Sequence, residues 1–389
     1  MHPSQKMDLL GTETAFEVLS RAEELKRQGR DIINLGIGQP DFVTAPHIVD
    51  AAIKALKDGQ HGYTPAPGIP ALREATANYI EKNCGVSVNA SNILITPGGK
   101  PSLFFAILMF GEPGAEILYP NPGFPIYQSM IKFSGATPIP IPLNEKQDFS
   151  FQAETILEKI NASTRLIIIN SPSNPTGRAV AERELEKLAN GLTNYPHVAV
   201  LSDEIYSRIY YRGEKPTSLL KFPQIRDRLI LLDGWSKTYA MTGWRVGFSL
   251  WPGSLIDKAI RLAINCHSCV NSSAQMGALA ALEGSQEHVS KMIAAFDERR
   301  KFVVAALNKL PGFTCREPNG AFYVFPNISG TGKSSQELQN ELLEKAGVAT
   351  IAGTSFGDLG EGFLRFSYAN SLENIQLATK KIETFLQSA

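Results

Sequence analysis

Short apolar segments alternate with helix-like segments through the middle of the chain, and this alternation limits the fold more than any other feature. The clearest strand candidates are residues 93–96, 166–169, 198–201 and 229–232. Further candidates are 116–118, 246–249 and the weaker 137–141, whose prolines would confine it to a sheet edge, and helical patterns cover 100–110, 124–132 and 181–192. The alternation predicts an α/β fold, with a large domain whose mostly parallel sheet is covered by helices on both faces.

The pattern changes from about residue 287 onward. A long helical pattern covers 288–310, and strand candidates at 321–325, 348–351 and 363–367 are mixed with helical patterns at 335–346 and 372–386. This region predicts a smaller α+β domain, and a helix over 14–28 is expected to pack near it. We therefore expect an N-terminal arm (1–45), a large domain (46–290) and a small C-terminal domain (291–389).

The charge balance and the apolar runs exclude several classes of function. Lys plus Arg and Asp plus Glu number 38 each, so there is no basic excess for a nucleic acid or an anionic membrane surface. No run approaches the roughly 18 apolar residues of a membrane span. The polar start lacks the apolar region of a signal peptide, and the expected location is cytoplasmic.

The chain holds four cysteines, too few for a disulfide framework in this length. Cys266 and Cys269 form a Cys-x-x-Cys, but a metal site would need two more ligands at suitable spacing. We expect buried structural thiols here and no metal centre.

Lys237 is the most informative single residue. It comes just after the apolar segment 229–232, and Arg245 follows eight residues later. A lysine at the end of a buried strand is costly unless its amine is used, for example to bond a carbonyl carbon, and a nearby arginine can hold a phosphate. Together they indicate a lysine that bonds the aldehyde of pyridoxal phosphate (PLP). The alternative is a surface lysine beside an ordinary salt bridge.

Polar side chains that suit PLP follow two other strands. Asp203 and Tyr206 come directly after 198–201, where a carboxylate can pair with the pyridine nitrogen and a phenol can donate to the phenolate oxygen. Glu204 is expected to point elsewhere, as successive residues do at a strand end. Asn174, in the proline-rich loop after 166–169, can donate to the same phenolate oxygen. The alternatives are a helix cap, a packing aromatic and a plain turn.

Two further segments supply a phosphate cup and a ring partner. Gly98-Gly99-Lys100 joins the strand candidate 93–96 to a helix, where free backbone N–H groups bind phosphate. Phe124 can stack on the pyridine ring, although an aromatic at this spacing also suits a core.

The substrate needs its own anchor. Arg365, flanked by apolar neighbours, can grip an α-carboxylate through two parallel hydrogen bonds, or it can form a structural salt bridge. Gly38 can add a backbone contact to the same carboxylate. Its Gly-x-Gly is not a dinucleotide fingerprint, because no third glycine and no helix follow it.

The ordered motifs resemble those of class I aminotransferases of PLP fold type I over nearly the whole length. They are Gly36-x-Gly38-x-Pro40-Asp41-Phe42, Tyr63-x-Pro65-x-x-Gly68, Asn174-Pro175-x-Gly177, Asp203-x-x-Tyr206, Ser236-Lys237 and Gly243-Trp244-Arg245. The two motifs at the front are similar to those of the bacterial subgroup that includes aspartate aminotransferases.

The resemblance implies an enzyme that moves an amino group from an L-amino acid to a 2-oxo acid by a ping-pong mechanism. Lys237 would form the internal aldimine and then shuttle the proton. The implied cofactor contacts are Asp203 to the pyridine nitrogen, Tyr206 and Asn174 to the phenolate oxygen, Phe124 on the ring, and Gly99, Lys100, Ser236 and Arg245 around the phosphate. Gly38, Asn174 and Arg365 would hold the α-carboxylate.

Two further implications concern assembly and the phosphate site. Tyr63 is expected to reach the phosphate in a neighbouring subunit, which makes the functional unit a homodimer. Many relatives carry a phosphate-binding Ser or Thr three positions before the lysine, where this chain has Gly234. Ser236 or a backbone N–H is expected to compensate.

The alternatives left open are a carbon–sulfur β-lyase of the same fold and an aspartate-specific aminotransferase. A PLP-binding regulator would need an additional DNA-binding module, and a dinucleotide-dependent oxidoreductase would need the missing glycine motif. We find no clear cation for a distal carboxylate near Ala15, Phe16 or 108–110. This favours neutral or varied amino-acid donors, with 2-oxoglutarate or pyruvate as acceptor.

Overall fold

A seven-stranded sheet forms the centre of the computed structural model, which describes residues 1–211, 213 and 215–388. The strand order is β2-β8-β7-β6-β5-β3-β4. Only β8 runs antiparallel to its neighbours, and every other pair is parallel. The strands are β2 (Ile93–Thr96), β3 (Glu116–Asn121), β4 (Thr137–Pro142), β5 (Thr164–Asn170), β6 (Ala199–Asp203), β7 (Leu229–Gly234) and β8 (Gly247–Leu250).

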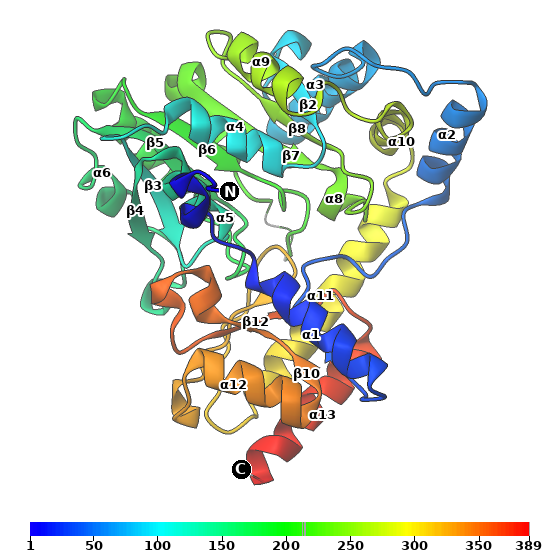
Figure 1. Cartoon of the computed structure of the whole chain (residues 1–389), viewed down its shortest axis with the longest axis vertical. Helices are drawn as coiled ribbons and strands as arrows, with labels where there is room; N and C mark the ends of the chain where they lie inside the picture. Colours follow the sequence, from blue (N-terminus) through cyan, green and yellow to red (C-terminus); the bar gives the residue numbers. More distant parts are fainter. Residues whose placement is uncertain (212, 214, 389) are drawn as a thin grey trace.

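Helices cover both faces of this sheet (Figure 1). They are α2 (Pro46–Lys57), α3 (Pro70–Cys84), α4 (Lys100–Phe110), α5 (Ile126–Ser134), α6 (Ala153–Leu157), α7 (Glu182–Gly191), α8 (Trp235–Thr238), α9 (Ile256–His267) and α10 (Ser272–Glu283). The strands are apolar on both sides because their residues alternate between two cores. Leu166 and Ile168 pack in the core beneath α4, α5 and α9, whereas Ile167 and Ile169 pack in the core on the opposite face.

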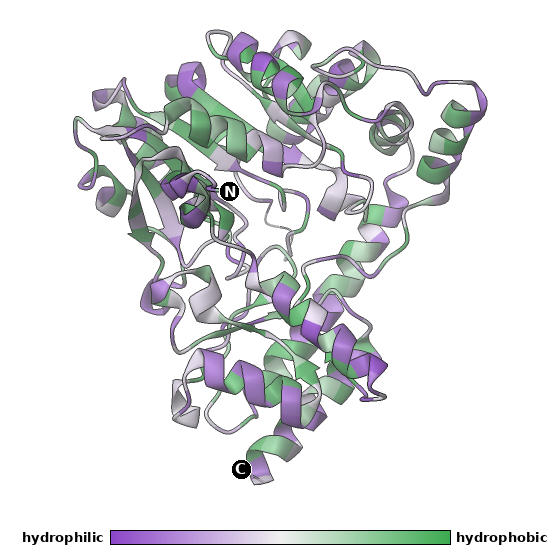
Figure 2. Cartoon of the chain, viewed as in Figure 1, coloured by the Kyte–Doolittle hydropathy of each residue, from purple (hydrophilic) through white to green (hydrophobic). Residues whose placement is uncertain are grey.

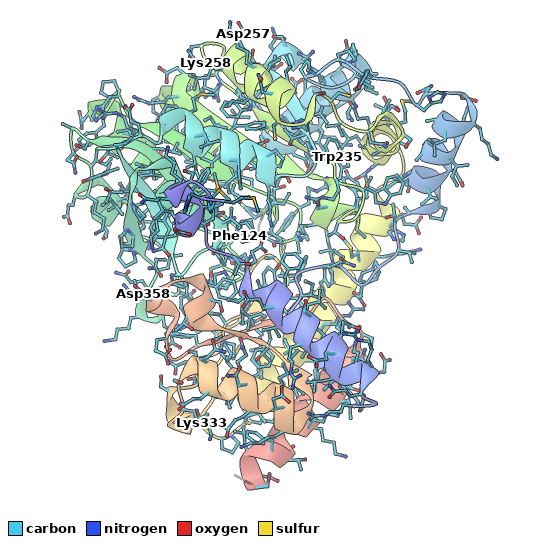
Figure 3. The ribbon with its side chains drawn as sticks, in the orientation of Figure 1. Phe124, Trp235, Asp257, Lys258, Lys333 and Asp358 are labelled. Atoms are coloured by element: carbon cyan, nitrogen blue, oxygen red, sulfur yellow. The ribbon has the colours of Figure 1, made fainter. Side chains whose placement is uncertain are left out.

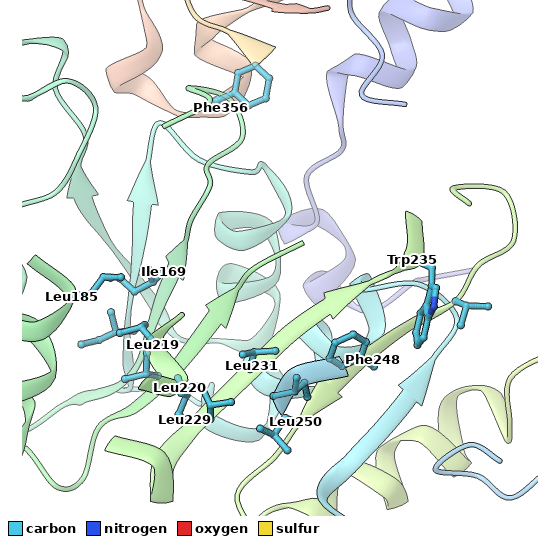
Figure 4. Close-up of a cluster of buried hydrophobic side chains, with 14 of the residues drawn as sticks. Ile169, Leu185, Leu219, Leu220, Leu229, Leu231, Trp235, Phe248, Leu250 and Phe356 are labelled. Atoms are coloured by element: carbon cyan, nitrogen blue, oxygen red, sulfur yellow. The ribbon is translucent and has the colours of Figure 1, made fainter. Parts of the chain in front are cut away.

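The second of these cores joins the sheet to its flanking elements. Figure 4 shows Ile169, Leu185, Leu231 and Phe248 within it, drawn from β5, α7, β7 and β8. Hydrophobic residues gather on the strands and on α4, while outer helices such as α1 (Thr14–Arg27) carry many hydrophilic residues (Figure 2). Within the described part of the chain, no helix is both long enough and apolar enough to cross a membrane.

A smaller unit follows the long helix α11 (Glu287–Leu307), which runs between the two parts of the molecule (Figure 1). It holds a three-stranded antiparallel sheet of order β11-β12-β9 and a short parallel pair, β1 with β10. These strands are β1 (Ile33–Asn34), β9 (Tyr323–Val324), β10 (Val348–Ala349), β11 (Ile351–Ala352) and β12 (Leu364–Ser367). The helical elements of the unit are α12 (Ser335–Glu341), a π-helical turn (Leu342–Ala346) and α13 (Leu372–Ser388).

The N-terminal segment connects both units. A short 3₁₀ helix (Gln5–Leu9) lies against α5, where the Gly11 N–H donates to Ser129 Oγ at 2.8 Å. The chain then runs to α1, which buries Val18, Ala22 and Leu25 and contacts β10 and β11 of the smaller unit. Residues between these two attachment points therefore lie across the boundary between the units (Figure 1).

Most expected elements are confirmed, including the proline-containing β4 at the sheet edge. Two expectations are wrong. The strand expected at 348–351 is two strands in different sheets, because the chain changes pairing partner at Thr350. Cys266 is exposed and Cys269 is partly buried, because α9 ends at His267 near the surface. The domain boundaries at residues 45 and 290 stay a prediction.

Candidate functional site

A cavity of about 510 Å³ opens where β2, β5, β6 and β7 end, and the smaller unit closes its other side. Its size is typical of a small-molecule site. Parallel strands bring their carboxyl ends to one edge, so residues far apart in sequence meet there. Every residue proposed for the site from the sequence lines this cavity except Tyr63. Phe124 lies near the boundary of the two units (Figure 3).

Lys237 lies in the short helix α8, directly after β7. Its ammonium group donates a hydrogen bond of 2.6 Å to the carbonyl of Gly38. Burial, together with the positive charges of Arg365 and Arg245, lowers the pKa of Lys237 to about 8. A substantial fraction of this amine is therefore neutral near pH 8, the form that attacks a carbonyl carbon.

Asp203 ends β6 and is buried in the cavity wall. Its carboxylate accepts a hydrogen bond of 2.7 Å from the Tyr127 hydroxyl and a longer one from the Ile205 N–H. Burial raises the pKa of Asp203 to about 6, although these donors and Lys237 oppose the shift. Glu204 accepts hydrogen bonds from Ser202, Ser218 and Leu219 instead, and it does not line the cavity.

Arg365 reaches the cavity from β12 of the smaller unit. Its guanidinium lies between two rings, 4.6 Å from the Tyr323 centroid and 4.8 Å from that of Phe356. It donates to Asn174 Oδ1 at 2.9 Å and to the Gly36 carbonyl, and burial lowers its pKa. Its buried Nε has no hydrogen-bond partner among the described residues. An unpaired buried donor of this kind needs an acceptor, which a substrate carboxylate would supply.

The Tyr206 hydroxyl lies 2.8 Å from that of Tyr323, a residue of β9 that also lines the cavity. Burial raises the pKa of Tyr206 well above its ordinary value, so this phenol keeps its proton at neutral pH. It therefore has a hydrogen to donate to an anionic oxygen.

Another part of the cavity wall is suited to a phosphate. The loop before α4 contains Gly98 with φ +82°, a conformation in which a side chain would collide with the Arg245 guanidinium. Arg245 donates to the carbonyl of Thr242 at 2.8 Å, and Ser236 lies buried on the cavity wall. The start of α4 faces the same space, so its free N–H groups and helix dipole add to the positive end.

Gly234 lies in a tight contact between strands. A Cβ added there would lie 2.9 Å from the Cα of Gly247, its cross-strand partner. A side chain at position 234 would therefore crowd the backbone of the neighbouring strand.

The donor set fits PLP. The cavity provides an amine of lowered pKa, a carboxylate, a protonated phenol, an amide and a glycine-rich anion cup. Phe124 lines the same cavity and packs edge-on against Tyr127, with the ring centroids 5.7 Å apart. Tyr63 is 95% exposed and borders a separate surface hollow with Cys269 and Ser272.

Sequence reasoning missed several cavity residues. Tyr127 donates a hydrogen bond to Asp203, and the Tyr323 hydroxyl is hydrogen-bonded to that of Tyr206. Ile351 and Phe356 are apolar residues of the cavity wall. Glu13 forms an ion pair with Lys100. A buried tyrosine hydroxyl usually has a partner, but a single sequence does not show which one.

Comparisons with known proteins agree with this site. A model of the family described as Aminotransferase class I and II matches residues 30–382. An aspartate aminotransferase of Pyrococcus horikoshii is 41% identical, with 95% of this chain and 94% of that protein covered. Among solved structures, an aspartate aminotransferase from Rhizobium meliloti has a TM-score of 0.95 at 31% identity, covering 100% and 99% of the two chains. An alanine aminotransferase from Pyrococcus furiosus has a TM-score of 0.93 at 31% identity, with both chains fully covered.

Proposed function

The chain belongs to the class I and II aminotransferases, and from this premise we propose which of its residues carry out the reaction. It is a PLP-dependent transaminase of fold type I that moves an amino group from an L-amino acid to a 2-oxo acid in two ping-pong half-reactions. The observation that carries the residue assignment is the single cavity in which Lys237, Asp203 and Arg365 meet.

When bound, PLP supplies an aldehyde that bonds amines and a protonated ring that withdraws electrons from the substrate's α-carbon. We assign Lys237 as the residue that holds this aldehyde covalently and later moves the proton at the α-carbon. Its lowered pKa suits a general base, because a free amine near pH 8 both accepts and returns a proton. Asp203 keeps the ring nitrogen protonated.

The remaining contacts orient the cofactor. Tyr206 and Asn174 donate to the phenolate oxygen, and Phe124 lies against the ring. Gly99, Lys100, Ser236 and Arg245 bind the phosphate, with backbone N–H groups at the start of α4 contributing. Tyr323 keeps the Tyr206 hydroxyl in place through their mutual hydrogen bond.

The substrate's α-carboxylate binds Arg365, with Asn174 and the backbone of Gly38 beside it. The free Nε and the forked shape of the guanidinium suit a planar carboxylate. The relatives reported above are named as aspartate and alanine aminotransferases, so similarity to them does not determine the amino-acid donor of this chain. We propose neutral or varied donors, with 2-oxoglutarate or pyruvate as acceptor; the apolar residues of the cavity wall, such as Phe16 and Phe356, support an uncharged donor side chain.

Replacing Arg365 by glutamine tests this assignment. We expect KM for any amino-acid donor to rise on the order of 10²-fold, because a charge-assisted bidentate contact is lost. PLP binding should stay within about threefold of the wild type. Stopped-flow absorbance with a panel of amino acids measures the first effect, and equilibrium titration with PLP measures the second. Arg365→Lys is the matched variant, since it keeps the charge and loses the fork. An unchanged KM in both variants would remove Arg365 from the substrate site.

We also propose that the functional unit is a homodimer in which Tyr63 completes the partner's phosphate site, and that the enzyme is cytoplasmic. The phenol of Tyr63 is exposed in the single chain and lies outside its own cavity, which supports a contact with a second chain. Tyr63→Phe is expected to weaken PLP binding about tenfold through loss of one hydrogen bond to a charged group.

Hybrid dimers give the sharper test of a shared site. A hybrid of one Tyr63→Phe chain and one Lys237→Ala chain has one site with both residues intact, so it should show about half the wild-type activity at limiting PLP. Differently tagged chains that are co-expressed and separated provide this hybrid. Activity no higher than that of the parent variants, or a monomer in sedimentation, would contradict the shared site.

A further inference from the structure

Three buried hydroxyl groups lie behind the glycine loop of the cavity. Thr96 ends β2, Ser102 lies in the first turn of α4, and Ser249 lies in β8. All three residues are fully buried, and none of them lines the cavity. Ser249 is the cross-strand partner of Leu94, so it faces the same apolar core beneath α4 and α9. Hydroxyls in such a place destabilise the fold unless each has a hydrogen-bond partner.

Hydrogen bonds connect these hydroxyls into one chain, which we call the hydroxyl relay (Trp251, Ser249, Ser102 and Thr96). Trp251 Nε1 donates to Ser249 Oγ at 2.7 Å, and Ser249 Oγ lies 2.8 Å from Ser102 Oγ. Ser102 Oγ lies 3.2 Å from Thr96 Oγ1, which donates to the Gly98 carbonyl at 2.7 Å. The indole only donates and the carbonyl only accepts, so each hydroxyl between them accepts one hydrogen bond and donates the next. The direction of the relay is therefore fixed.

The last bond of the relay holds the peptide between Gly98 and Gly99. This peptide is trans, so its carbonyl and its N–H point in opposite directions. The Gly98 carbonyl points toward Thr96 in the buried relay, whereas Gly99 lines the cavity. The Gly99 N–H is consequently directed away from the relay, toward the space in which a phosphate would lie.

A peptide between two glycines turns easily unless something restrains it. Neither residue has a Cβ, so the backbone on both sides of the peptide has unusual conformational freedom. The peptide packs closely against β8, because a Cβ on Gly247 would lie 2.6 Å from the Gly98 carbonyl carbon and 2.7 Å from the Gly99 nitrogen. This packing limits where the peptide lies, and the Thr96 hydroxyl determines which way its carbonyl and its N–H face.

The relay also strengthens the Gly99 N–H as a donor. Hydrogen bonds that run in one direction polarise one another by roughly 10–30% per bond, and the bond to the Gly98 carbonyl draws electron density from the same peptide. Gly234, at the end of the neighbouring strand β7, has no side chain that could donate to a phosphate. Backbone N–H groups therefore carry more of the contact with an anion in this loop.

We propose that the hydroxyl relay positions the phosphate site of the cofactor. Thr96 sets the orientation of the peptide, and Ser102 and Ser249 polarise it, so that the Gly99 N–H donates to a phosphate oxygen. The inference rests on the proposed function, which places the phosphate of PLP at this loop. The relay touches neither cofactor nor substrate, and it acts only through the peptide.

Binding of PLP and of pyridoxal to the apoprotein tests the proposal, because the two molecules differ only in the phosphate. Equilibrium titration followed by absorbance gives both dissociation constants. Thr96→Val removes the hydroxyl and keeps the branched shape of the side chain. We expect the preference for PLP over pyridoxal to fall about tenfold in this variant, the effect of one lost hydrogen bond to a charged group, while pyridoxal binding stays within about twofold. Ser102→Ala keeps the bond to Gly98 and loses its polarisation, so the preference should fall about two- to threefold.

Two variants serve as controls. Thr96→Ser restores a hydroxyl and should keep the preference within about twofold of the wild type. Thr76→Val removes a fully buried hydroxyl of α3 that donates to the Leu72 carbonyl at 2.7 Å, a bond of the same kind away from the cavity. It should leave the preference unchanged within about twofold. Phosphorus NMR of bound PLP adds a second readout, since the resonance should shift in Thr96→Val and stay in place in Thr76→Val.

The outcomes separate this inference from the proposed function. If the wild type prefers PLP and Thr96→Val keeps the same preference, the inference is overturned and the proposed function stands. An equal loss in Thr76→Val, or no recovery in Thr96→Ser, would also overturn it, because packing rather than the hydrogen bond would then cause the loss. If the wild type binds PLP and pyridoxal equally well, the phosphate assignment in the proposed function fails, and the inference fails with it.

Discussion

Lys237→Ala is expected to lower transamination by about 10⁴-fold, the upper end of what a positioned general base contributes. The variant should also lose covalent capture of the cofactor, since the amine that bonds the aldehyde is gone. Borohydride reduction followed by peptide mapping measures this loss: wild-type enzyme should carry a reduced pyridoxyl group on residue 237, and the variant should carry none. Single-turnover kinetics measures the rate.

Lys100→Ala is the matched control for this prediction, because it removes another amine from the same cavity. It should keep the reduced group on Lys237. The pH dependence adds a second readout. Because the pKa of Lys237 is lowered to about 8, its neutral fraction rises through pH 8, and PLP capture by the apoprotein should accelerate from pH 7 to pH 9. A label on a different lysine, or steady turnover by Lys237→Ala, would refute the assignment.

Asp203→Asn is expected to lower kcat on the order of 10²–10³-fold, comparable to losing one preorganised electrostatic partner. The amide keeps an oxygen for the Tyr127 hydroxyl but removes the negative charge that would hold a proton on the ring nitrogen. Asp203→Glu retains that charge and should recover part of the rate. Steady-state kinetics at saturating PLP checks both variants, and equal rates for Asn and Asp would remove the charge from the mechanism.

Asp203→Asn is expected to stabilise the apoprotein at pH 8, although it lowers kcat. Burial raises the pKa of Asp203 from 3.8 to about 6, so the folded state binds the proton more tightly than the unfolded state. The stabilising contribution is present below pH 4 and is lost as the pH rises through 6. At pH 8 the Asn variant should therefore melt at a higher temperature than the wild-type apoprotein, and the difference should shrink toward pH 4. This pattern would mark Asp203 as a residue kept for function at a cost in stability.

Much of the fold could be predicted because the apolar segments are short, continuous and separated by helical patterns. β2, β5, β6 and β7 follow directly from them, and their carboxyl ends locate the site. Lys237, Asp203 and Asn174 follow those strand ends in sequence, so position alone suggested them. The division of 348–351 into two strands at Thr350 could not be predicted, because an apolar strand pattern does not show which strand it will pair with.

Contacts in the site between residues that are far apart along the chain could not be predicted from the sequence either. Glu13 and Lys100 are 87 residues apart, and neither lies in a recognisable motif with the other. Tyr323 and Tyr206 are 117 residues apart and meet because the fold packs both into one buried cluster. Composition shows that such charges and hydroxyls exist, whereas only the folded chain shows which of them are neighbours.

The opposite orientations of Asp203 and Glu204 limit how the gene for this protein can change in length. Because side chains alternate along β6, deleting or inserting one codon within this strand would turn Glu204 or Ser202 toward the cavity and bury Asp203 among the hydrogen-bonding partners of Glu204. Insertions and deletions should therefore be tolerated in the loops at the amino ends of the strands, far from the cavity. The spacing between the start of β6 and Tyr206 should remain fixed in any functional descendant.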